Sequence, residues 1–346
     1  MRGRRLTIVA ATTALVVLAA ACDAVPGDFT GDRKADLVYF TVPSTAPSFQ
    51  QVGSSAPLFT GQVGDVPAPG DYDGDLKWEP AVLRGTTWIS STLASPIEYD
   101  PAGMPSGTPG TPSSPYILGT PLTPPTLVPV PGDYDGTGKM VPAYYDEVDG
   151  SWWIMGHSGS VQFGVPPVGG GTYGFDVPVP ADYDGDHKTD IATYRPSDGS
   201  FHYLSSKTGQ EQTVSVGPPG SFPVPADYDK VGHAEPAVVA QVSTGPTSNY
   251  QWLVAGSSTP LATITSSGGI VPAPGDYDGD GHADAAQLDL GSGSWQLAGA
   301  SPLATGLGGP VVPTELPIGT FQNVVRLAVY GQCLSYAAEF NLPNLC

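Results

Sequence analysis

Short acidic stretches carry the residues of this sequence that are best suited to chemistry. The segments DYDGDHKTD (residues 182–190) and DYDGDGHAD (residues 276–284) each place carboxylates at positions 1, 3, 5 and 9, counted from the first Asp. Carboxylates this close repel one another by about 1 kcal/mol per pair in water, and by several times that near a protein surface. A cation is therefore the natural counterpart of these side chains.

The donor set indicates which cation this is. All four positions offer oxygen, and neither Cys nor His stands at any of them, so a hard ion is favoured. A flexible loop with mixed ligands suits Ca²⁺ better than Mg²⁺, and glycine at position 4 or 6 lets the backbone fold around the ion. The predicted calcium ligands in these two segments are Asp182, Asp184, Asp186, Asp190, Asp276, Asp278, Asp280 and Asp284.

The nine-residue pattern occurs six times, as loops 28, 71, 133, 182, 227 and 276, each called by the number of its first Asp. Two further loops offer a full oxygen set, formed by Asp71, Asp73, Asp75 and Glu79 and by Asp28, Thr30, Asp32 and Asp36. Loop 133 has Val141 at position 9 and loop 227 has Val231 at position 5, so both are expected to be weak or empty. The sequence thus predicts about four calcium sites, on the count of charged ligands.

Other sites of known pattern are excluded by counting. An EF-hand requires Glu at position 12, where Thr193 and Gln287 stand, and calcium β-helices require tandem nine-residue repeats, which are absent. No serine-hydrolase elbow, zinc motif or phosphate loop occurs, and acids committed to calcium cannot serve as a glycosidase pair. No catalytic residue is predicted, and His187, His233 and His282, at position 6 or 7 of their loops, are expected to be solvated.

The elements that position these loops follow from the repeat. The loops recur roughly every 50 residues, which is the period of a four-stranded propeller blade. Residues 177–217 read as one such unit: VPVPADY, DIATYRP, SFHYLSS and QTVSVG alternate as strands, with the acidic loop and PSDG as turns. The longest interval contains residues 101–126, a stretch rich in Pro, Ser and Thr that we interpret as a surface insertion.

Paired prolines identify the innermost strand. Pro178 and Pro180 remove N–H groups from the same edge of their strand, so only an edge without a neighbour tolerates them. The pair recurs in front of loops 71, 133, 227 and 276. The strand that lines the central channel of a propeller fits this requirement.

We therefore expect an all-β protein with a single β-propeller domain over residues 22–346. Repeat units start near residues 26, 66, 128, 177, 222, 271 and 311. The last unit, VVPTELPIGTFQNVVRLAVYGQC, lacks an acidic loop, and its Leu327 to Tyr330 match Ile191 to Tyr194. Seven blades are expected, the last one degenerate, with six blades plus a C-terminal cap as the alternative.

Aromatic residues recur once per unit. Position 2 of every loop is Tyr or Phe, and the third strands carry a Trp or Phe, namely Trp88, Trp152, Phe201, Trp252 and Trp295. Both sets are expected to pack between blades. Trp153 follows Trp152 directly and so points to the opposite side of its strand, where exposure is expected.

The N-terminus predicts export. Residues 1–21 combine a cationic start with an apolar run and a small-residue cleavage site, and Cys22 follows as in the lipobox of bacterial lipoproteins. Simple secretion is the alternative. Acylation of Cys22 leaves Cys333 and Cys346 as a disulfide pair, and the formal net charge of −20 excludes nucleic acid as a partner.

Taken together, the loops and strands resemble FG-GAP/VCBS repeats, the calcium-bearing blades of integrin-α-like propellers, in the bacterial form DYDGDGxxDxAxYRPSxGxW. The resemblance covers residues 26 to about 300, on six copies of the motif. It implies a propeller, commonly of seven blades, with Ca²⁺ in the loop between the first two strands of each blade. Family members serve in adhesion and ligand recognition.

Two functions are consistent with this sequence. The first is a monomeric, cell-surface recognition or adhesion module that binds a glycan or a protein and touches the membrane only through its lipid anchor. The second is a structural or accessory domain of the envelope with no ligand except calcium. An exported hydrolase is the least favoured reading.

Overall fold

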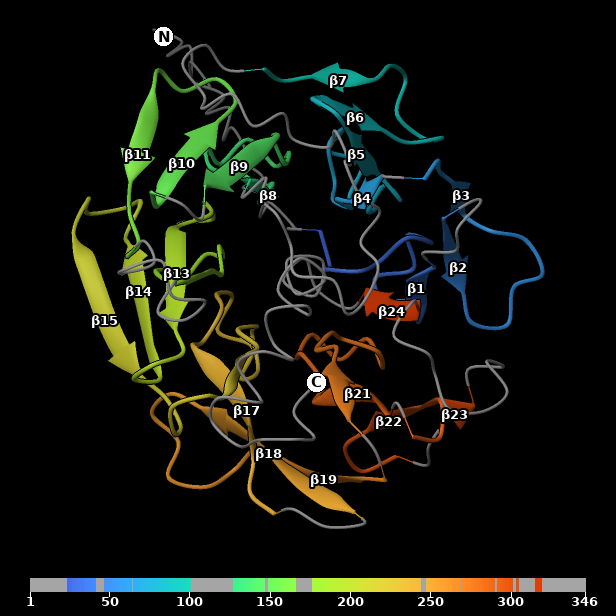
Figure 1. Ribbon diagram of the computed structural model, residues 1–346, viewed down its shortest axis with the longest axis vertical. Coiled ribbons are helices and arrows are strands. Elements are labelled where there is room, and N and C mark those ends of the chain that lie inside the picture. Colours follow the sequence, from blue (N-terminus) through green and yellow to red (C-terminus); the bar gives the residue numbers. More distant parts are fainter. Residues whose placement is uncertain are drawn as a thin grey trace, which may run out of the picture.

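Four-stranded antiparallel sheets account for the described part of this protein. The structure is a computed structural model, and it describes residues 24–41, 47–63, 65–100, 127–146, 149–165, 176–243, 247–267, 269–289, 291–300, 303–304 and 315–318. Within these residues there are 24 strands and no helix, and the strands form six sheets. The six sheets stand around a central axis as the blades of a β-propeller (Figure 1).

The first three blades are formed as follows. Blade 1 contains β24 (Glu315–Ile318), β1 (Val38–Thr41), β2 (Ser48–Gln51) and β3 (Phe59–Thr60). Blade 2 contains β4 (Val66–Pro67), β5 (Val82–Arg84), β6 (Thr87–Ile89) and β7 (Ile97–Glu98). Blade 3 contains β8 (Leu127–Pro129), β9 (Ala143–Asp146), β10 (Ser151–Ile154) and β11 (Ser160–Gln162).

The other three blades repeat this order. Blade 4 contains β12 (Val177–Pro178), β13 (Ile191–Arg195), β14 (Ser200–Leu204) and β15 (Glu211–Ser215). Blade 5 contains β16 (Phe222–Pro223), β17 (Ala237–Gln241), β18 (Ser248–Val254) and β19 (Ala262–Ser266). Blade 6 contains β20 (Ile270–Pro272), β21 (Ala286–Asp289), β22 (Ser294–Leu297) and β23 (Leu303–Ala304).

The described ring has six blades, which corrects the expected seven-blade ring in favour of the six-blade alternative. The C-terminal cap of that alternative lies outside the described residues. The segment expected to begin a seventh blade, β24, pairs with β1 from Val38↔Ile318 to Thr41↔Glu315 and so completes blade 1. A strand from the C-terminal part of the chain thereby closes the ring against the N-terminal blade. Leu327 to Tyr330, the predicted pair Cys333 and Cys346, Cys22 and the insertion at 101–126 lie outside the described residues.

The first strand of blades 2 to 6 is short and pairs with a single neighbour. In blade 4, Val177 pairs with Tyr194 and Pro178 with Thr193, while no described strand pairs with the other edge. In Figure 1 the first strands β4 and β8 lie on the inner side of their blades, and the fourth strands, such as β15 and β19, lie at the periphery. This arrangement confirms the position that the paired prolines predict.

A tyrosine at position 2 of each loop, or Phe in loop 28, fixes the innermost strand from within the blade. In five loops its hydroxyl donates to the backbone carbonyl four residues earlier, at 2.6 to 2.9 Å: Tyr72 to Ala68, Tyr134 to Val130, Tyr183 to Val179, Tyr228 to Val224 and Tyr277 to Ala273. The ring of the tyrosine packs in the interior while its hydroxyl satisfies a buried acceptor. Phe29 holds the equivalent place in loop 28 and has no hydroxyl to donate.

The core lies between neighbouring blades, and this corrects one expectation. Trp88, Trp152, Trp252, Trp295 and Phe201 are at most 1% exposed, as expected for third-strand aromatics. Trp153 is also buried, at 8%, and packs in a cluster with residues of blade 2. Because both faces of a blade contact other blades, successive residues on β10 are buried on opposite sides, and alternation does not expose one of them.

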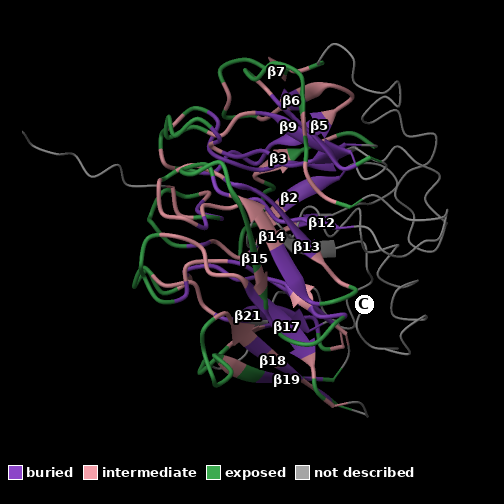
Figure 2. Ribbon diagram, turned by 90° about the vertical axis from the view of Figure 1, so that its left-hand side faces the viewer, coloured by how far each residue is buried: buried purple, intermediate pink, exposed green. Residues whose placement is uncertain are grey.

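The inner strands of the blades, such as β13, are buried, whereas exposed residues lie in loops and on outer strands such as β15 (Figure 2). No helix in the described part of the chain has the length and apolar character needed to cross a membrane.

Replacing Tyr183 by Phe tests the hydroxyl anchor. We expect Tyr183→Phe to lower the free energy of unfolding by about 1 to 3 kcal/mol, because the carbonyl of Val179 loses a buried donor. Tyr203→Phe is the matched control: Tyr203 stacks on Tyr183 in the same blade, and its hydroxyl makes no hydrogen bond to the described residues. Urea unfolding measures both variants, and equal stability of the two would contradict the role given to the hydroxyl.

Candidate metal sites

Loops 71 to 276 are closed turns between the first two strands of their blades, and loop 28 leads into β1, the second strand of blade 1. An antiparallel bridge joins the residue before position 1 to position 9, as in Ala181↔Asp190, in loops 71 to 276. In loop 28 the equivalent contact is the N–H of Asp36 on the carbonyl of Gly27, at 2.9 Å. The base of every loop is therefore fixed before any ion is considered.

The carboxylate of position 1 folds the loop from inside. In loop 182, Asp182 accepts the N–H groups of Gly185 and His187 at 2.7 and 2.8 Å. In all six loops this carboxylate accepts the N–H of position 6, at 2.7 to 3.0 Å. Where position 9 is acidic, its carboxylate accepts the N–H of position 2, at 2.7 to 2.9 Å.

Positions 4 and 6 have left-handed backbone in every loop. Glycine meets this need at most of these positions, with φ between 70° and 88°. All four described non-glycine residues with positive φ also stand here: Arg33, Leu76 and His187 at position 6 and Lys230 at position 4, with φ from 62° to 71°. A non-glycine residue adopts this conformation only where its surroundings impose it.

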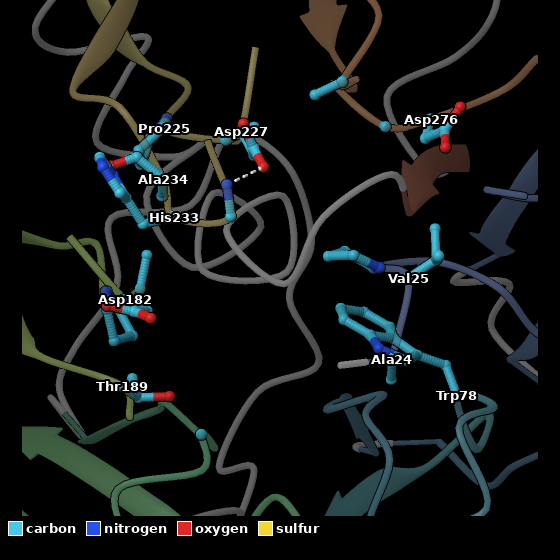
Figure 3. Close-up of a pocket in the computed structure, with 18 of the residues that line it drawn as sticks. Ala24, Val25, Trp78, Asp182, Thr189, Pro225, Asp227, His233, Ala234 and Asp276 are labelled. Atoms are coloured by element: carbon cyan, nitrogen blue, oxygen red, sulfur yellow. Dashed lines mark hydrogen bonds between the residues drawn. The ribbon is translucent and has the colours of Figure 1, made fainter. Parts of the chain in front are cut away.

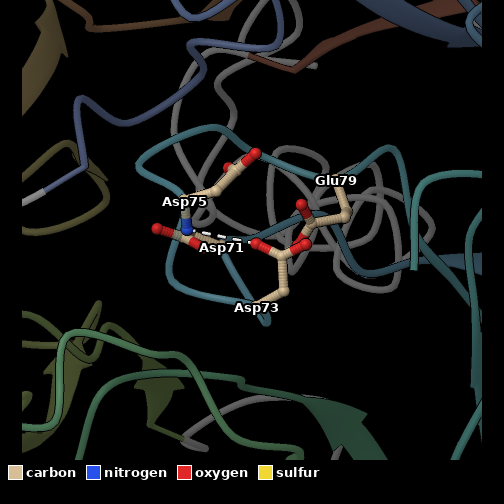
Figure 4. Close-up of side chains that lie close together, drawn as sticks. All are labelled: Asp71, Asp73, Asp75 and Glu79. Atoms are coloured by element: carbon tan, nitrogen blue, oxygen red, sulfur yellow. Dashed lines mark hydrogen bonds between the residues drawn. The ribbon is translucent and has the colours of Figure 1, made fainter. Parts of the chain in front are cut away.

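The carboxylates of loop 71 converge on one point. Asp71, Asp73, Asp75 and Glu79 each offer an oxygen, and these oxygens lie within 4.8 Å of one another (Figure 4). Asp71 and Glu79 are 2% exposed, whereas Asp73 and Asp75 face the solvent. The site is thus a half-open cup with two acids at its floor.

Three other loops gather acids in the same way. The groups within 4.8 Å are Asp182, Asp184 and Asp190, then Asp276, Asp278 and Asp284, and then Asp227, Asp229 and Glu235. Asp186 and Asp280, at position 5, are outside these groups and instead accept the N–H of position 7, at 3.0 and 2.9 Å. Loop 227 has Val231 instead of an acid at position 5, yet its three acids lie as close together as those of loops 182 and 276. By this geometry, loop 227 is as suited to a metal ion as the other two.

Loops 28 and 133 differ from these four. No group of this kind in the described part of the chain includes Asp28, Asp32 and Asp36, and the calcium ligands assigned to this loop, Thr30 among them, stay a prediction. In loop 133, His157 from the turn after β10 lies 3.1 Å from Asp135. Loop 133 thus has a histidine next to its position 3 acid, whereas loops 71, 182, 227 and 276 each bring at least three carboxylates together.

The donor sets fit a hard cation. Asp184 Oδ1 and Glu235 Oε1 are buried carboxylate oxygens with no hydrogen-bond partner among the described residues. A buried oxygen with a lone pair and no donor is costly, and a divalent ion in the loop would satisfy it. Asp182, Asp184 and Asp190, and likewise Asp227, Asp229 and Glu235, would hold such an ion.

Burial and mutual repulsion raise the pKa values of these acids. Desolvation, with smaller contributions from Asp73, Asp71 and Asp75, raises the pKa of Glu79 from 4.5 to about 7. Desolvation also raises the pKa of Glu235 to about 7, with Asp229 contributing. The pKa values of the position 9 acids Asp36, Asp190 and Asp284 are raised mainly by burial as well. Without a cation, the innermost acid of a loop resists ionisation.

Residues from a second turn cover loop 182, and the sequence did not single them out. The turn between β14 and β15 places Ser205 Oγ 2.5 Å from Asp184 Oδ2, and Ser206 donates its N–H to Asp190 at 2.7 Å. His157 occupies the corresponding turn of blade 3. In the sequence, these serines are indistinguishable from ordinary turn residues. No sequence signal therefore predicts their contact with the acids.

Residues at positions 6 and 7 are not uniformly solvated. His187 is exposed as expected, but His233 and His282 are half-buried, and His282 Nδ1 lies 3.1 Å from the carbonyl of Tyr228 in loop 227. Lys34 Nζ likewise donates to the carbonyl of Asp278 in loop 276, at 2.5 Å. The expectation of solvated histidines is wrong for His233 and His282, because position 7 of one loop lies against the neighbouring loop.

A cavity of about 420 Å³ opens on the propeller axis beside the loops (Figure 3). Ala24, Val25 and Trp78 lie on one side of it, opposite Thr189 and Ala234. Its lining is mostly apolar, and it includes the position 1 acids of loops 182, 227 and 276. The first described residues of the chain therefore lie at the centre of the face that carries the acidic loops.

No known protein family model matches this chain, and no curated protein sequence matches it. The likeness of the six loops to FG-GAP/VCBS repeats therefore stays an interpretation of the sequence.

The raised pKa values predict how the metal-free protein responds to pH. Between pH 4.5 and about 7, Glu79 and Glu235 bind protons in the folded state that the unfolded chain has released. The free energy of unfolding should therefore fall as the pH rises through this window. Urea unfolding at constant ionic strength with a chelator measures it, and the double variant Glu79→Gln, Glu235→Gln should show a flatter profile. Stability that rises with pH by the same amount in both proteins would contradict the assignment.

Proposed function

We propose that this protein is an exported calcium-binding β-propeller, of the FG-GAP/VCBS type, that acts as a recognition or adhesion module at the cell surface. The observation that supports calcium most directly is the convergence of acids in equivalent loops of several blades, with two buried carboxylate oxygens left without a partner. Oxygen-only donors in a loop of mixed ligand geometry favour Ca²⁺ over transition metals.

Calcium would act on stability rather than on a reaction. When bound, the ion supplies positive charge that offsets the repulsion among the acids of a loop. The side chains of this protein do the rest: position 1 folds the loop through its N–H contacts, and position 9 ties the loop to the start of the second strand. An ion held by both would fix the first hairpin of a blade and, with it, the edge of the central channel.

We also propose that the mature protein is a lipoprotein acylated at Cys22, with free secretion as the alternative. Ala24 lies among residues of loops 71, 133 and 182, including Asp71, Asp133 and Asp182. Two residues span at most about 7 Å of chain. An anchor at Cys22 would therefore hold the loop-bearing face toward the membrane and leave the opposite face directed outward, available to a glycan or protein ligand.

A hydrolase remains the least favoured function, and the contacts of blade 4 support that ranking. Ser200 Oγ lies 2.8 Å from His202 Nε2, and His202 Nδ1 lies 3.3 Å from Glu211 Oε1, which are distances found in catalytic triads. However, Ser200 is 4% exposed and its hydroxyl donates to Asp198 at 2.5 Å. The single proton of this serine points away from the imidazole, so histidine is not placed to remove it.

Calcium removal is the first test of this proposal. Calcium at tenfold excess over a site's Kd contributes about 1.4 kcal/mol to the folded state, so a chelator should lower the Tm of the mature protein markedly. Asp184→Asn and Asp278→Asn should each remove one ion from the stoichiometry measured by isothermal titration calorimetry. Asp100→Asn, at an exposed acid outside the loops, should keep both the stoichiometry and the Tm. A metal-free sample that takes up no calcium and melts unchanged would overturn the proposal.

Ligand capture separates recognition from an accessory role. We expect the mature protein to bind a component of a glycan array or of cell-wall extracts saturably, and to release it when a chelator loosens the loops. The Asp184→Asn, Asp278→Asn double variant should show weaker capture, whereas Asp100→Asn should match the unmodified chain. Stoichiometric calcium binding without any saturable ligand would favour the structural or accessory domain.

A further inference from the structure

The six acidic loops are joined to one another by backbone hydrogen bonds. In each case the N–H of position 8 in one loop donates to the carbonyl of position 1 in the preceding loop. The six bonds, at 2.6 to 2.8 Å, run from Trp78 to Asp28, Met140 to Asp71, Thr189 to Asp133, Ala234 to Asp182, Ala283 to Asp227 and Ala35 to Asp276. The last bond returns to the first loop, so the loops form a closed circle.

The two ends of each bond lie at fixed positions of the acidic loops. The acceptor is the carbonyl of the position 1 acid, whose carboxylate folds its own loop. The donor stands directly before position 9 of the next loop, which is the acid at the floor of that loop in every case except Val141 of loop 133. In the bond from Ala234 to Asp182, for example, one end is an acid of loop 182 and the other end precedes Glu235 of loop 227.

Side chains reinforce these contacts. A Cβ added at Gly185 of loop 182 would lie 3.3 Å from the ring of His233, and one added at Gly279 of loop 276 would lie 2.8 Å from Lys34. Lys77, Lys139 and Lys188 cover the glycines at position 4 of loops 28, 71 and 133 in the same way. Neighbouring loops are thus in direct contact through position 7 of one and position 4 of the other.

We propose that the loops bind calcium cooperatively, each filled loop raising the affinity of the two loops beside it. This inference rests on the proposed function, namely that the loops take calcium. An ion that draws position 1 and position 9 together orders the peptide between them, and the shared hydrogen bond carries that order into the next loop. The neighbour then loses less conformational entropy when its own ion binds, which is positive coupling without a change of fold.

Electrostatics opposes this coupling, and the structure shows how the opposition is weakened. A filled loop is less negative, so it attracts a second cation to its neighbour less strongly. Exposed charges are screened over about 8 Å at physiological ionic strength. At four of the six contacts between loops, the position 7 cations Lys34, Lys77, Lys139 and Lys188 also reduce the field that a neighbouring ion would experience, whereas His233 and His282 stand at the other two.

Loop 227 offers the sharpest test because of its place in the circle. It lies between loops 182 and 276, and it gathers Asp227, Asp229 and Glu235 despite Val231 at position 5. Loop 71 lies on the opposite side of the circle and shares no hydrogen bond with any of these three loops. If loop 227 is disabled, the effect on its neighbours can be measured at loops 182 and 276, and loop 71 serves as an internal control.

The experiment is hydrogen exchange of the mature protein, followed by mass spectrometry across a calcium titration. The calcium midpoint for protection is read separately for peptides that cover loops 71, 182, 227 and 276. In the unmodified protein we expect steep transitions with a Hill coefficient above 1. The variant Asp229→Asn, Glu235→Gln should raise the midpoints of loops 182 and 276 by roughly 5-fold or more and leave that of loop 71 unchanged.

Two further variants keep the outcomes separable. Asp73→Asn, Glu79→Gln disables loop 71, and it should leave the midpoints of loops 182 and 276 unchanged. Ala283→Pro removes the N–H that bonds to Asp227 while every acid stays in place, and it should lower the Hill coefficient. Circular dichroism checks that each variant retains its strands.

The results distinguish this inference from the proposed function. Independent midpoints, or a loop 227 that calcium never protects, would overturn the coupling and leave calcium binding by the other loops intact. Protection of no loop at any calcium concentration would overturn the calcium proposal itself.

Discussion

The first Asp of each loop is the residue on which the ring depends. Its carboxylate accepts the N–H of position 6 in every loop, and its carbonyl accepts the N–H of position 8 from the next loop. One residue thereby folds its own turn and holds the neighbouring blade. A hydrogen bond from N–H to a charged carboxylate is stronger than one to a neutral acceptor, so aspartate serves this position better than asparagine or serine.

This use of position 1 creates an electrostatic problem that the remaining positions make worse. Once Asp71 is fixed at the floor of its loop, Glu79 follows at the bridge and lies in the same buried volume. Burial raises the pKa of Glu79, and the neighbouring acids Asp71, Asp73 and Asp75 add a smaller contribution. The loop is also held with left-handed backbone at Leu76, so its shape is not the one that its side chains alone would choose. A cation at the centre is the simplest agent that relieves the charge while keeping the shape.

Much of the fold could be predicted from local pattern. The period of the acidic loops and the paired prolines such as Pro178 and Pro180 are short-range signals, and they placed the first strand of blades 2 to 6 at the axis. The closure of blade 1 by β24 could not be predicted in this way, because pairing between residues as far apart in the chain as Val38 and Ile318 leaves no local mark. Trp153 was misjudged for a related reason: alternation identifies the two faces of a strand, but in a ring of blades both faces are interior.

The number of blades follows from two contacts that do not depend on each other. The pairing of β24 with β1 accounts for the segment that the repeat pattern predicts as the start of a seventh blade. Separately, Ala35 of loop 28 donates to the carbonyl of Asp276, and a Cβ added at Gly275 would lie 2.8 Å from the Cβ of Ala35. Blade 6 is therefore in contact with blade 1 at the loop-bearing face, and no space remains between them for another blade. Even without β24, the circle of loops closes at six.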